Sequence, residues 1–260
     1  MGMRFFGASV TRKEDPALLT GMGRYVDDVK LPRMAHAAFV RSVHAHALIK
    51  SINADKARAL PGVICVLMHK DLPEPLRSRR LPLYVPHPAI KQTFMPNILV
   101  EKEACFVGEA IAIVVAENRY IAEDAAALVE IDYEVLPASL NPLSAIEENA
   151  PRAQIEAKNN IVTQTPITIG DTDKAFAQAK HVFSERFFMH RGGPFFLECR
   201  GVVADWDRHA EQLTVYAASQ GSHRFKRTFI DLLDLADQQV RVITNDVGGG
   251  FGPKGSFYAE

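Results

Sequence analysis

The feature that most constrains this chain is a glycine-rich loop that directly follows a strand-forming run. Residues 240–247 read VRVITNDV, and these β-branched, partly alternating residues predict a strand that delivers the loop from a sheet edge. Four loop positions lack a Cβ: Gly248, Gly249, Gly250 and Gly252. The backbone can therefore approach a ligand closely, and its amides can point together at an anion. Because the sequence stops five residues after Gly255, we expect most walls of such a site to come from elsewhere.

The loop is a poor match to the common nucleotide-binding motifs. Residues 250–255 (GFGPKG) fit the G-x-G-x-x-G pattern, but a Rossmann site also needs a following helix and an acidic residue about twenty positions later. Pro253 also removes one backbone N–H from the loop. A Walker loop is excluded because Lys254 lies between a proline and a glycine. On motif shape alone, a tight turn without a ligand remains an alternative.

The composition is that of a soluble globular protein. Thirty basic and 31 acidic residues give a net charge of -1, so electrostatics does not favour nucleic acid or a membrane surface as a partner. The sequence contains neither a signal-peptide pattern nor a run of eighteen apolar residues, and we expect a cytoplasmic protein. Its three cysteines are odd in number and far apart, which fits neither a disulfide framework nor a metal-ligand set. We expect buried or incidental thiols at Cys65, Cys105 and Cys199.

The pattern of apolar residues predicts an α+β chain in two domains. The predicted strands are 35–43, 63–68, 110–116, 130–134, 181–189, 201–206, 212–218 and 240–247, and the predicted helices are 55–60, 118–129, 171–179 and 222–235. The proline-rich stretch 71–97 is expected to form a long irregular loop. A second irregular stretch between Leu136 and Gln164 marks the boundary between the domains. The expected organisation is an arm (1–19), a first domain (20–137), a linker (138–165) and a second domain (166–260).

Several polar features have competing interpretations. His44 and His46 share a strand face and could ligate a metal, but no third ligand lies nearby, so packing or hydrogen bonding is favoured. Glu198 could help hold the loop region or line a pocket, although a salt bridge with Arg200 or another arginine is the commoner role of such a residue. The basic run 77–80 is typical of a solvated stretch and could also contact an acidic partner surface.

Three motifs in the second half resemble those of one enzyme family. They are GPFFLECRG (193–201), ASQGSHR (218–224) and DVGGGFGPK (246–254), in this order along the chain. Together they resemble the molybdopterin-binding large subunit of the xanthine dehydrogenase, aldehyde oxidase and carbon monoxide dehydrogenase family. Five motifs in the first half resemble the family's α/β hammerhead domain: GRYVDD (23–28), RSVHAHA (41–47), LPGV (60–63), VGEAIA (107–112) and AEDAA (122–126). The resemblance implies a hammerhead-like domain at 20–137 and the first part of a molybdenum-cofactor-binding α+β domain at 166–260.

The resemblance assigns cofactor-binding roles to five residues. Gln220 matches a glutamine whose side-chain amide reaches an oxo ligand of the molybdenum, which suits an amide donor. Phe251 and Gly252 match the part of the loop that lies against the metal and the substrate, with the Gly252 amide approaching the apical oxygen. Gly249 and Gly250 belong to the same turn. Without the other motifs, Gln220 would be interpreted as a polar residue at a strand end and Phe251 as a core residue.

The resemblance also implies a reaction, a cofactor and partners. We expect oxidative hydroxylation of an aldehyde or an electron-poor heteroaromatic carbon with oxygen from water. The cofactor would be a molybdenum-pterin, either molybdopterin or its cytosine dinucleotide form, held by its dithiolene rather than by protein side chains. Electrons would pass to [2Fe-2S] clusters on a small subunit and to FAD on a medium subunit. No catalytic residue is expected in this chain, because the general-base glutamate belongs to a later segment of the large subunit.

Two departures from the family pattern narrow the expected substrate. Purine-oxidising members carry an acidic residue shortly after the loop lysine, whereas Gly255 follows Lys254 here, so xanthine is disfavoured. Carbon monoxide is also disfavoured, because the active-site cysteine loop of the enzymes that oxidise it is not seen in these residues. One alternative is a split or truncated large subunit that is inactive alone and serves as an assembly module. Another is an unrelated strand-rich binding protein with an incidental glycine loop.

Overall fold

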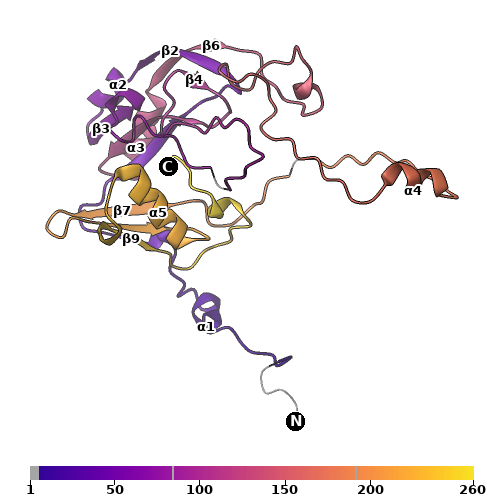
Figure 1. The fold of residues 1–260 in the computed structure, drawn as a ribbon. Coiled ribbons are helices and arrows are strands. Elements are labelled where there is room, and N and C mark those ends of the chain that lie inside the picture. Colours follow the sequence, from indigo (N-terminus) through magenta and orange to yellow (C-terminus); the bar gives the residue numbers. More distant parts are fainter. Residues whose placement is uncertain (1–5, 84, 191) are drawn as a thin grey trace. The chain divides into compact units, whose positions relative to one another are not determined.

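The computed structural model describes residues 6–83, 85–190 and 192–260, which form two compact units (Figure 1). Unit 1 combines the segment up to Pro32 with Pro194–Ser256, and unit 2 combines Arg33–Gly193 with Phe257–Glu260. Helices and sheets alternate along the chain, which agrees with the α+β class expected from the sequence. The compact units cut the chain at positions other than the expected domain boundaries, and those boundaries (19/20, 137/138 and 165/166) stay predictions.

The first sheet of unit 2 is built around a fully apolar central strand. β5 (Ala110–Ala116) lies between β1 (His36–Arg41) and β3 (Val63–Met68), and both pairings are antiparallel. The sequence of β5 is AIAIVVA, and this lack of alternation suits a strand that is covered on both faces. Ile111, Ala112 and Val114 have no exposed surface. The strand therefore forms the centre of the core of unit 2.

Two helices cover one face of this sheet. α2 (Asp55–Ala59) and α3 (Arg119–Ala127) contribute Ala57 and Ala125 to the same apolar cluster as Val114. α3 begins where the sequence predicted, because the Asn118 side chain accepts a hydrogen bond from the Ile121 amide at 3.0 Å. Figure 1 shows α2 and α3 beside β3, as the contacts between these elements require.

The second sheet of unit 2 packs on the other side of the core. It has the order β4 (Glu103–Ala104), β2 (Ala47–Asn53), β6 (Glu130–Val135), with antiparallel pairings. Side chains of β2 and β6 meet Ile111 of the first sheet in one cluster, which also contains Val100 and Ala104. The sequence predicted β6 but did not predict β2 or β4. β2 has the pattern ALIKSIN, in which apolar and polar residues alternate only in part.

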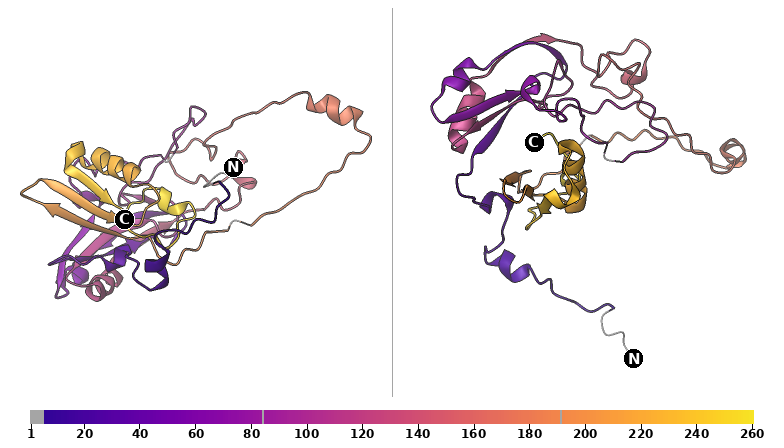
Figure 2. Two further views of the ribbon diagram at one scale, coloured as in Figure 1. Left: turned by 90° about the horizontal axis from the view of Figure 1, so that it is seen from below. Right: turned by 60° about the vertical axis from the view of Figure 1, so that its left-hand side comes forward.

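Unit 1 contains a three-stranded sheet covered by one helix. β7 (Val202–Asp207) and β8 (Gln212–Ala217) form an antiparallel hairpin, and β8 pairs in parallel with β9 (Val240–Ile243). A parallel pair needs a crossover connection, and α5 (Ser222–Leu233) provides it. Phe225, Phe229 and Leu233 of α5 pack on the buried residues of β8, as the predicted helical stripe required. Figure 2 shows this helix above the strands of its own unit.

The N-terminal segment completes unit 1. It contains α1 (Asp15–Leu19), which has no buried residue, and the short 3-10 helix η1 (Val26–Asp28). The amide of Arg24 donates to a carboxylate oxygen of Asp246 at 2.8 Å, and the amide of Asp246 donates to the Arg24 carbonyl at 3.0 Å. These two hydrogen bonds attach the N-terminal segment to the backbone that leads into the glycine loop. The other 3-10 helices are η2 (His69–Asp71), η3 (Ser144–Ile146), η4 (Asp237–Gln239) and η5 (Pro253–Gly255).

Two expectations about local structure were wrong. Residues 181–189, predicted as a strand, have no strand partner in the part of the chain that the structure describes. β9 ends at Ile243 instead of Val247, because the following residues have no partner along β8. Of the thiols expected to be buried or incidental, Cys65 and Cys105 are partly covered and Cys199 is exposed. The helix expected at 171–179 does form as α4 (Thr172–Gln178), capped by Asp171.

The two irregular stretches of unit 2 contact each other. Gln92, in the proline-rich loop, donates to the carbonyl of Ile161 at 2.7 Å, and Gln154 donates to the carbonyl of Phe94 at 3.0 Å. Part of the segment expected to be a linker is therefore held against the loop that precedes it. Within the described residues, no helix combines the length and apolar character that a membrane crossing requires.

Candidate functional site

The glycine loop has a backbone that most residue types cannot adopt. Gly249 and Gly252 have φ angles of 92° and 106°, which only glycine adopts without strain. Between them, Phe251 has a φ of 47°, an uncommon conformation for a bulky residue. Its side chain is 71% exposed, so the alternative of a core residue at this position is wrong. The turn therefore presents an aromatic ring on the surface of unit 1 and does not bury it.

A carboxylate holds the start of the loop. Glu198 Oε2 accepts a hydrogen bond from the Gly248 amide at 2.8 Å, and its other oxygen lies 3.4 Å from the Val26 amide. The backbone of Glu198 donates in turn to the Gly248 carbonyl at 3.2 Å. A Cβ on Gly248 would lie 2.5 Å from the Cβ of Glu198, so only glycine allows this approach. Glu198 thereby joins the loop to the N-terminal segment.

Lys254 neutralises this carboxylate from within the core of unit 1. Its ammonium lies 2.7 Å from Glu198 Oε2, and its side chain has no exposed surface, while the Glu198 side chain is 14% exposed. The ammonium also lies over the Phe196 ring, 5.0 Å from the centroid. The sequence favoured an arginine as the partner of Glu198, and this was wrong. The sequence did contain a signal for such a partner. Glu198 is a single acid within the apolar run FFLEC, and a buried acid requires a cation or hydrogen-bond donors.

Gln220 is fixed against the other end of the loop. The Gly252 amide donates to Gln220 Oε1 at 3.0 Å, and the Gln220 amide donates to the Lys254 carbonyl at 2.9 Å. A Cβ on Gly250 would lie 2.6 Å from the carboxamide carbon of Gln220. The four glycines are thus required for different reasons. Gly248 and Gly250 make room for Glu198 and Gln220, whereas Gly249 and Gly252 provide the positive φ angles.

The strands on either side of the site are also tied together. Ser219 at the end of β8 and Thr244 after β9 share a hydrogen bond of 3.0 Å between their hydroxyl oxygens. This contact, with the Glu198 and Gln220 contacts, brings the three motifs of the second half to one end of the β7–β8–β9 sheet. The sequence predicted Gln220, Gly249, Gly250, Phe251 and Gly252 for this site, and the structure gathers them. It also named Glu198 as an acid that could help hold the loop, which the structure confirms, and it missed the supporting residues Val26, Thr244 and Lys254.

The residues of the loop fit a bulky anionic group with oxygen ligands. Gly252 has no atom within 4 Å of the position where its Cβ would be, so a ligand can reach the backbone there. The oxygen of the Gln220 carboxamide is occupied by the Gly252 amide, which orients its NH₂ group. In the described chain that NH₂ group has no hydrogen-bond acceptor, and it remains available as a donor. The Glu198 charge is already neutralised by Lys254 and so does not repel an anion strongly.

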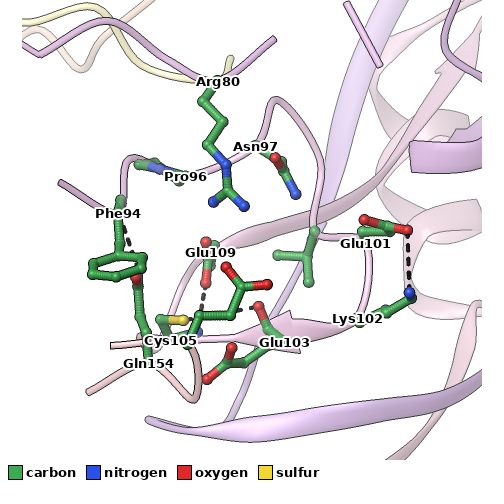
Figure 3. A pocket seen from close by; sticks show the side chains of 12 residues that line it. Arg80, Phe94, Pro96, Asn97, Glu101, Lys102, Glu103, Cys105, Glu109 and Gln154 are labelled. Atoms are coloured by element: carbon green, nitrogen blue, oxygen red, sulfur yellow. Dashed lines mark hydrogen bonds and ion pairs between the residues drawn. The ribbon is translucent and has the colours of Figure 1, made fainter. Parts of the chain in front are cut away.

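A second polar cluster lies in unit 2 and contains none of the residues predicted for the cofactor. It surrounds a pocket of about 150 Å³, into which Glu103, Cys105 and Glu109 project, with Arg80 opposite (Figure 3). Glu109 accepts a hydrogen bond from the Cys105 amide at 2.6 Å, and Glu103 accepts one from the Ile155 amide at 2.8 Å. These contacts hold the strand ends and the 154–156 segment together. The cluster therefore serves to stabilise the local structure.

The histidine pair predicted as a weak metal candidate is used for packing. Both ring nitrogens of His46 are occupied, one 2.9 Å from the Pro137 carbonyl and the other 2.7 Å from Glu103 Oε1. The ring of His44 packs edge-on against Tyr133 at 4.9 Å. Among the described residues, no group of three or more His, Cys, Asp or Glu side chains is arranged to hold a metal ion. The structure therefore agrees with the favoured interpretation, in which His44 and His46 take part in packing and hydrogen bonding.

Burial controls the acidity of this cluster. It raises the pKa of the Cys105 thiol to about 12, and the carboxylates of Glu109 and Glu103 act in the same direction. Burial also raises the pKa of Glu109, against the effect of two backbone amides that donate to it. A raised pKa favours the neutral form of both groups. Cys105 is therefore a poor nucleophile at neutral pH.

We expect replacement of Lys254 by Met to destabilise unit 1 by about 3 kcal/mol, because it leaves the Glu198 carboxylate without its cation. Trp206, the sole tryptophan of the chain, lies in β7 and reports unfolding of this unit by fluorescence in urea. Lys226→Met is the matched control, since it removes a surface ion pair with Asp237 that should contribute less than about 1 kcal/mol. Equal losses in the two variants would contradict the role given to Lys254.

We expect iodoacetamide at pH 8 to alkylate Cys199 and to leave Cys105 largely unmodified. With a pKa of about 12, Cys105 has a thiolate fraction about a thousandfold below that of the same thiol in the unfolded chain. Peptide mass spectrometry measures both rates in one sample, and the urea-unfolded chain is the control in which the two cysteines should react alike. Equal rates in the folded protein would show that Cys105 is not shielded.

Comparison with known proteins identifies both halves of the chain. Residues 20–137 match the family model described as "Aldehyde oxidase and xanthine dehydrogenase, a/b hammerhead domain", and residues 153–260 match the model described as "Molybdopterin cofactor-binding domain". The large chain of carbon monoxide dehydrogenase from Afipia carboxidovorans is 38% identical over 97% of this chain. The large subunit of nicotine 6-hydroxylase from Paenarthrobacter nicotinovorans is 34% identical over 98% of it.

Solved structures give the same result. Quinoline 2-oxidoreductase from Pseudomonas putida 86 superposes with a TM-score of 0.88 at 35% identity, over 97% of this chain and 32% of that one. The Cu,Mo-containing carbon monoxide dehydrogenase superposes with a TM-score of 0.85 at 38% identity over the same shares of the two chains. The chain thus spans about a third of the length of the relatives that it matches. It belongs to the family of molybdopterin-binding large subunits that includes xanthine dehydrogenase, aldehyde oxidase and carbon monoxide dehydrogenase, and it corresponds to their N-terminal portion.

Proposed function

We propose that this chain forms one wall of a molybdenum-pterin site in an oxidoreductase that hydroxylates an aldehyde or an electron-poor heteroaromatic carbon with oxygen from water. The observation that carries the proposal is the fixed carboxamide of Gln220. Its oxygen accepts the Gly252 amide at 3.0 Å, which leaves its NH₂ group as an oriented donor beside an open glycine backbone. The family models and the relatives support the cofactor.

Each loop residue has a proposed task at this wall. The NH₂ group of Gln220 donates to an oxygen ligand of the cofactor, and its orientation is preset by the hydrogen bond from Gly252. Gly252 lets the cofactor approach the backbone, while Gly249 and Gly250 shape the turn. The exposed ring of Phe251 offers an apolar face to a planar substrate and keeps water from that side. When bound, the molybdenum-pterin supplies the two-electron redox chemistry and activates the water-derived nucleophile.

We propose a role for Gly252 that differs from the one that the resemblance implies. From the resemblance, its amide would approach the apical oxygen of the metal, but here that amide donates to Gln220. We therefore assign the donor function at this position to the Gln220 side chain. Gly252 contributes its lack of a side chain and its hydrogen bond to Gln220.

We propose that the remaining parts of the site and the electron path lie outside these 260 residues. We propose that the general-base glutamate lies in the remaining segment of the large subunit, and that electrons leave through [2Fe-2S] and FAD subunits. One relative is named subunit gamma of the 6-hydroxypseudooxynicotine dehydrogenase complex, which supports assembly from several chains. A cofactor in the molybdopterin or cytosine dinucleotide form and a cytoplasmic location complete the proposal.

We propose that these residues, which the relatives share, contribute more to binding the cofactor than to selecting the substrate. The relatives that match it are named for different molecules, among them carbon monoxide, nicotine and quinoline. A segment that is common to all of them fits the part of the site that all of them need. The substrate is then selected by walls outside these 260 residues.

The proposal is tested by co-expressing the chain with a companion polypeptide that spans the part of the relatives' large chain not matched here. We expect the purified pair to retain molybdenum and pterin, measured by metal analysis and pterin fluorescence. Gln220→Ala in the pair should lower the turnover of an aldehyde or quinoline substrate about a hundredfold, because one oriented donor is lost. Gln238→Ala, at another exposed glutamine of unit 1, is the matched control.

Two outcomes would contradict the proposal. The pair could form and still retain no molybdenum under conditions in which a complete family enzyme is loaded. Alternatively, Gln220→Ala could match Gln238→Ala in both turnover and molybdenum content. Molybdenum retained by the chain without the companion would instead contradict the assembly-module alternative.

A further inference from the structure

One continuous segment of unit 2 has no core of its own. Every residue from 161 to 190 is exposed, including all residues of α4. The segment is not uniformly polar, because Ile167, Ile169 and Phe176 are 63% to 83% exposed among its polar residues. Exposed apolar side chains on this scale mark a surface that another polypeptide covers.

The strongest apolar character lies in residues 181–190, which read HVFSERFFMH. Their large apolar side chains are Val182 (57% exposed), Phe183 (90%), Phe187 (88%), Phe188 (79%) and Met189 (92%). In an extended backbone, Phe183, Phe187 and Met189 lie on one face, and Val182 and Phe188 lie on the other. Apolar residues on both faces are typical of a strand inside a sheet rather than at its solvent surface.

The backbone of the same residues is unpaired. No backbone hydrogen bond joins residues 181–190 to another described part of the chain, and Figure 2 shows no strand between α4 and β7. Free N–H and C=O groups along an extended segment are a template for pairing with a further strand. The sequence predicts a strand at 181–189, and what is missing is its partner.

The relatives indicate which polypeptide the partner is. They match 97% to 98% of this chain but place it within single large chains of which it is only about a third. In each of these relatives, a segment equivalent to 181–190 is accompanied by a much longer stretch of the same subunit. The unmatched stretch is therefore the polypeptide from which a partner strand is expected.

We propose that residues 181–190 become a β-strand by pairing with the polypeptide that corresponds to the unmatched, roughly two-thirds part of the large subunit. This polypeptide buries Phe183, Phe187 and Met189 on one face and Val182 and Phe188 on the other. The pairing joins these residues to the remainder of the large subunit. The inference rests on the proposed function for the identity of the companion.

The experiment measures amide hydrogen exchange in the chain alone and in the co-expressed pair. We expect the amides of residues 181–190 to exchange rapidly in the chain alone and to be slowed at least about a hundredfold in the pair. The sheet of β7, β8 and β9 should be protected in both samples and serves as the internal reference. The measurement does not depend on molybdenum and can be made on pairs without cofactor.

Two variants test whether the apolar faces drive the contact. Phe183→Ser and Phe187→Ser should each raise the dissociation constant of the pair about tenfold or more, measured by titration of the purified components. Leu140→Ser is the matched control, because Leu140 is also 82% exposed in unit 2 but lies outside the segment. All three substitutions affect exposed residues, so the isolated chain should remain folded.

Three results would overturn the inference. The pair could form while residues 181–190 exchange as rapidly as in the chain alone. The phenylalanine variants could bind as tightly as Leu140→Ser, or protection could appear in the isolated chain as its concentration rises, which would identify a second copy as the partner. A protected segment in a pair that binds no molybdenum would contradict the proposed function alone.

Discussion

The arrangement of the candidate site depends on one buried ion pair, between Lys254 and Glu198. The ammonium of Lys254 has no exposed surface and lies 2.7 Å from the carboxylate. Through the same carboxylate, the glycine loop at Gly248 and the N-terminal segment at Val26 are joined. A buried pair of this kind costs desolvation energy and is of limited value for stability alone. Its value here is that it fixes the backbone on both sides of Phe251 and Gly252.

The same pair explains why the loop residues have so little freedom. Lys254 is anchored by Glu198, and its carbonyl accepts the Gln220 amide. Gln220 is then held through both its backbone and its side-chain oxygen. The loop needs glycine where another backbone or side chain approaches and where φ is positive. The loop and Gln220 therefore form a rigid wall with an oriented amide donor. Little reorganisation of this wall is needed when a ligand binds.

Much of the fold follows from patterns that are local in the sequence. The apolar run of β5, the Asn118 cap of α3 and the stripe on α5 each predict their element, because short-range physics decides them. β2 was not predicted, because its apolar and polar residues alternate only weakly and its burial depends on partners that are distant in the sequence. The strand predicted at 181–189 is the reverse case, since its pattern is strong but no other described strand pairs with it.

The loop residues of the candidate site could be predicted from sequence motifs. The residues that support the loop could not, because they are determined by three-dimensional packing. Gln220, Phe251 and three of the loop glycines were predicted from motif order, whereas the partner of Glu198 depends on which cation the fold brings into the core. Arginine is the more frequent choice for buried pairs, and only the three-dimensional packing against Phe196 selects Lys254.

The central claim is that Gln220, held by the loop, presents its amide to the molybdenum cofactor. A crystal structure of the chain with its companion and the bound cofactor measures this directly, as the distance from Gln220 Nε2 to the nearest oxygen ligand of the metal. We predict a hydrogen bond of about 3 Å, with the contacts of Glu198 to Gly248 and Lys254 retained. A Gln220 side chain directed away from the cofactor, or a loop that rearranges and breaks the ion pair, would contradict the account.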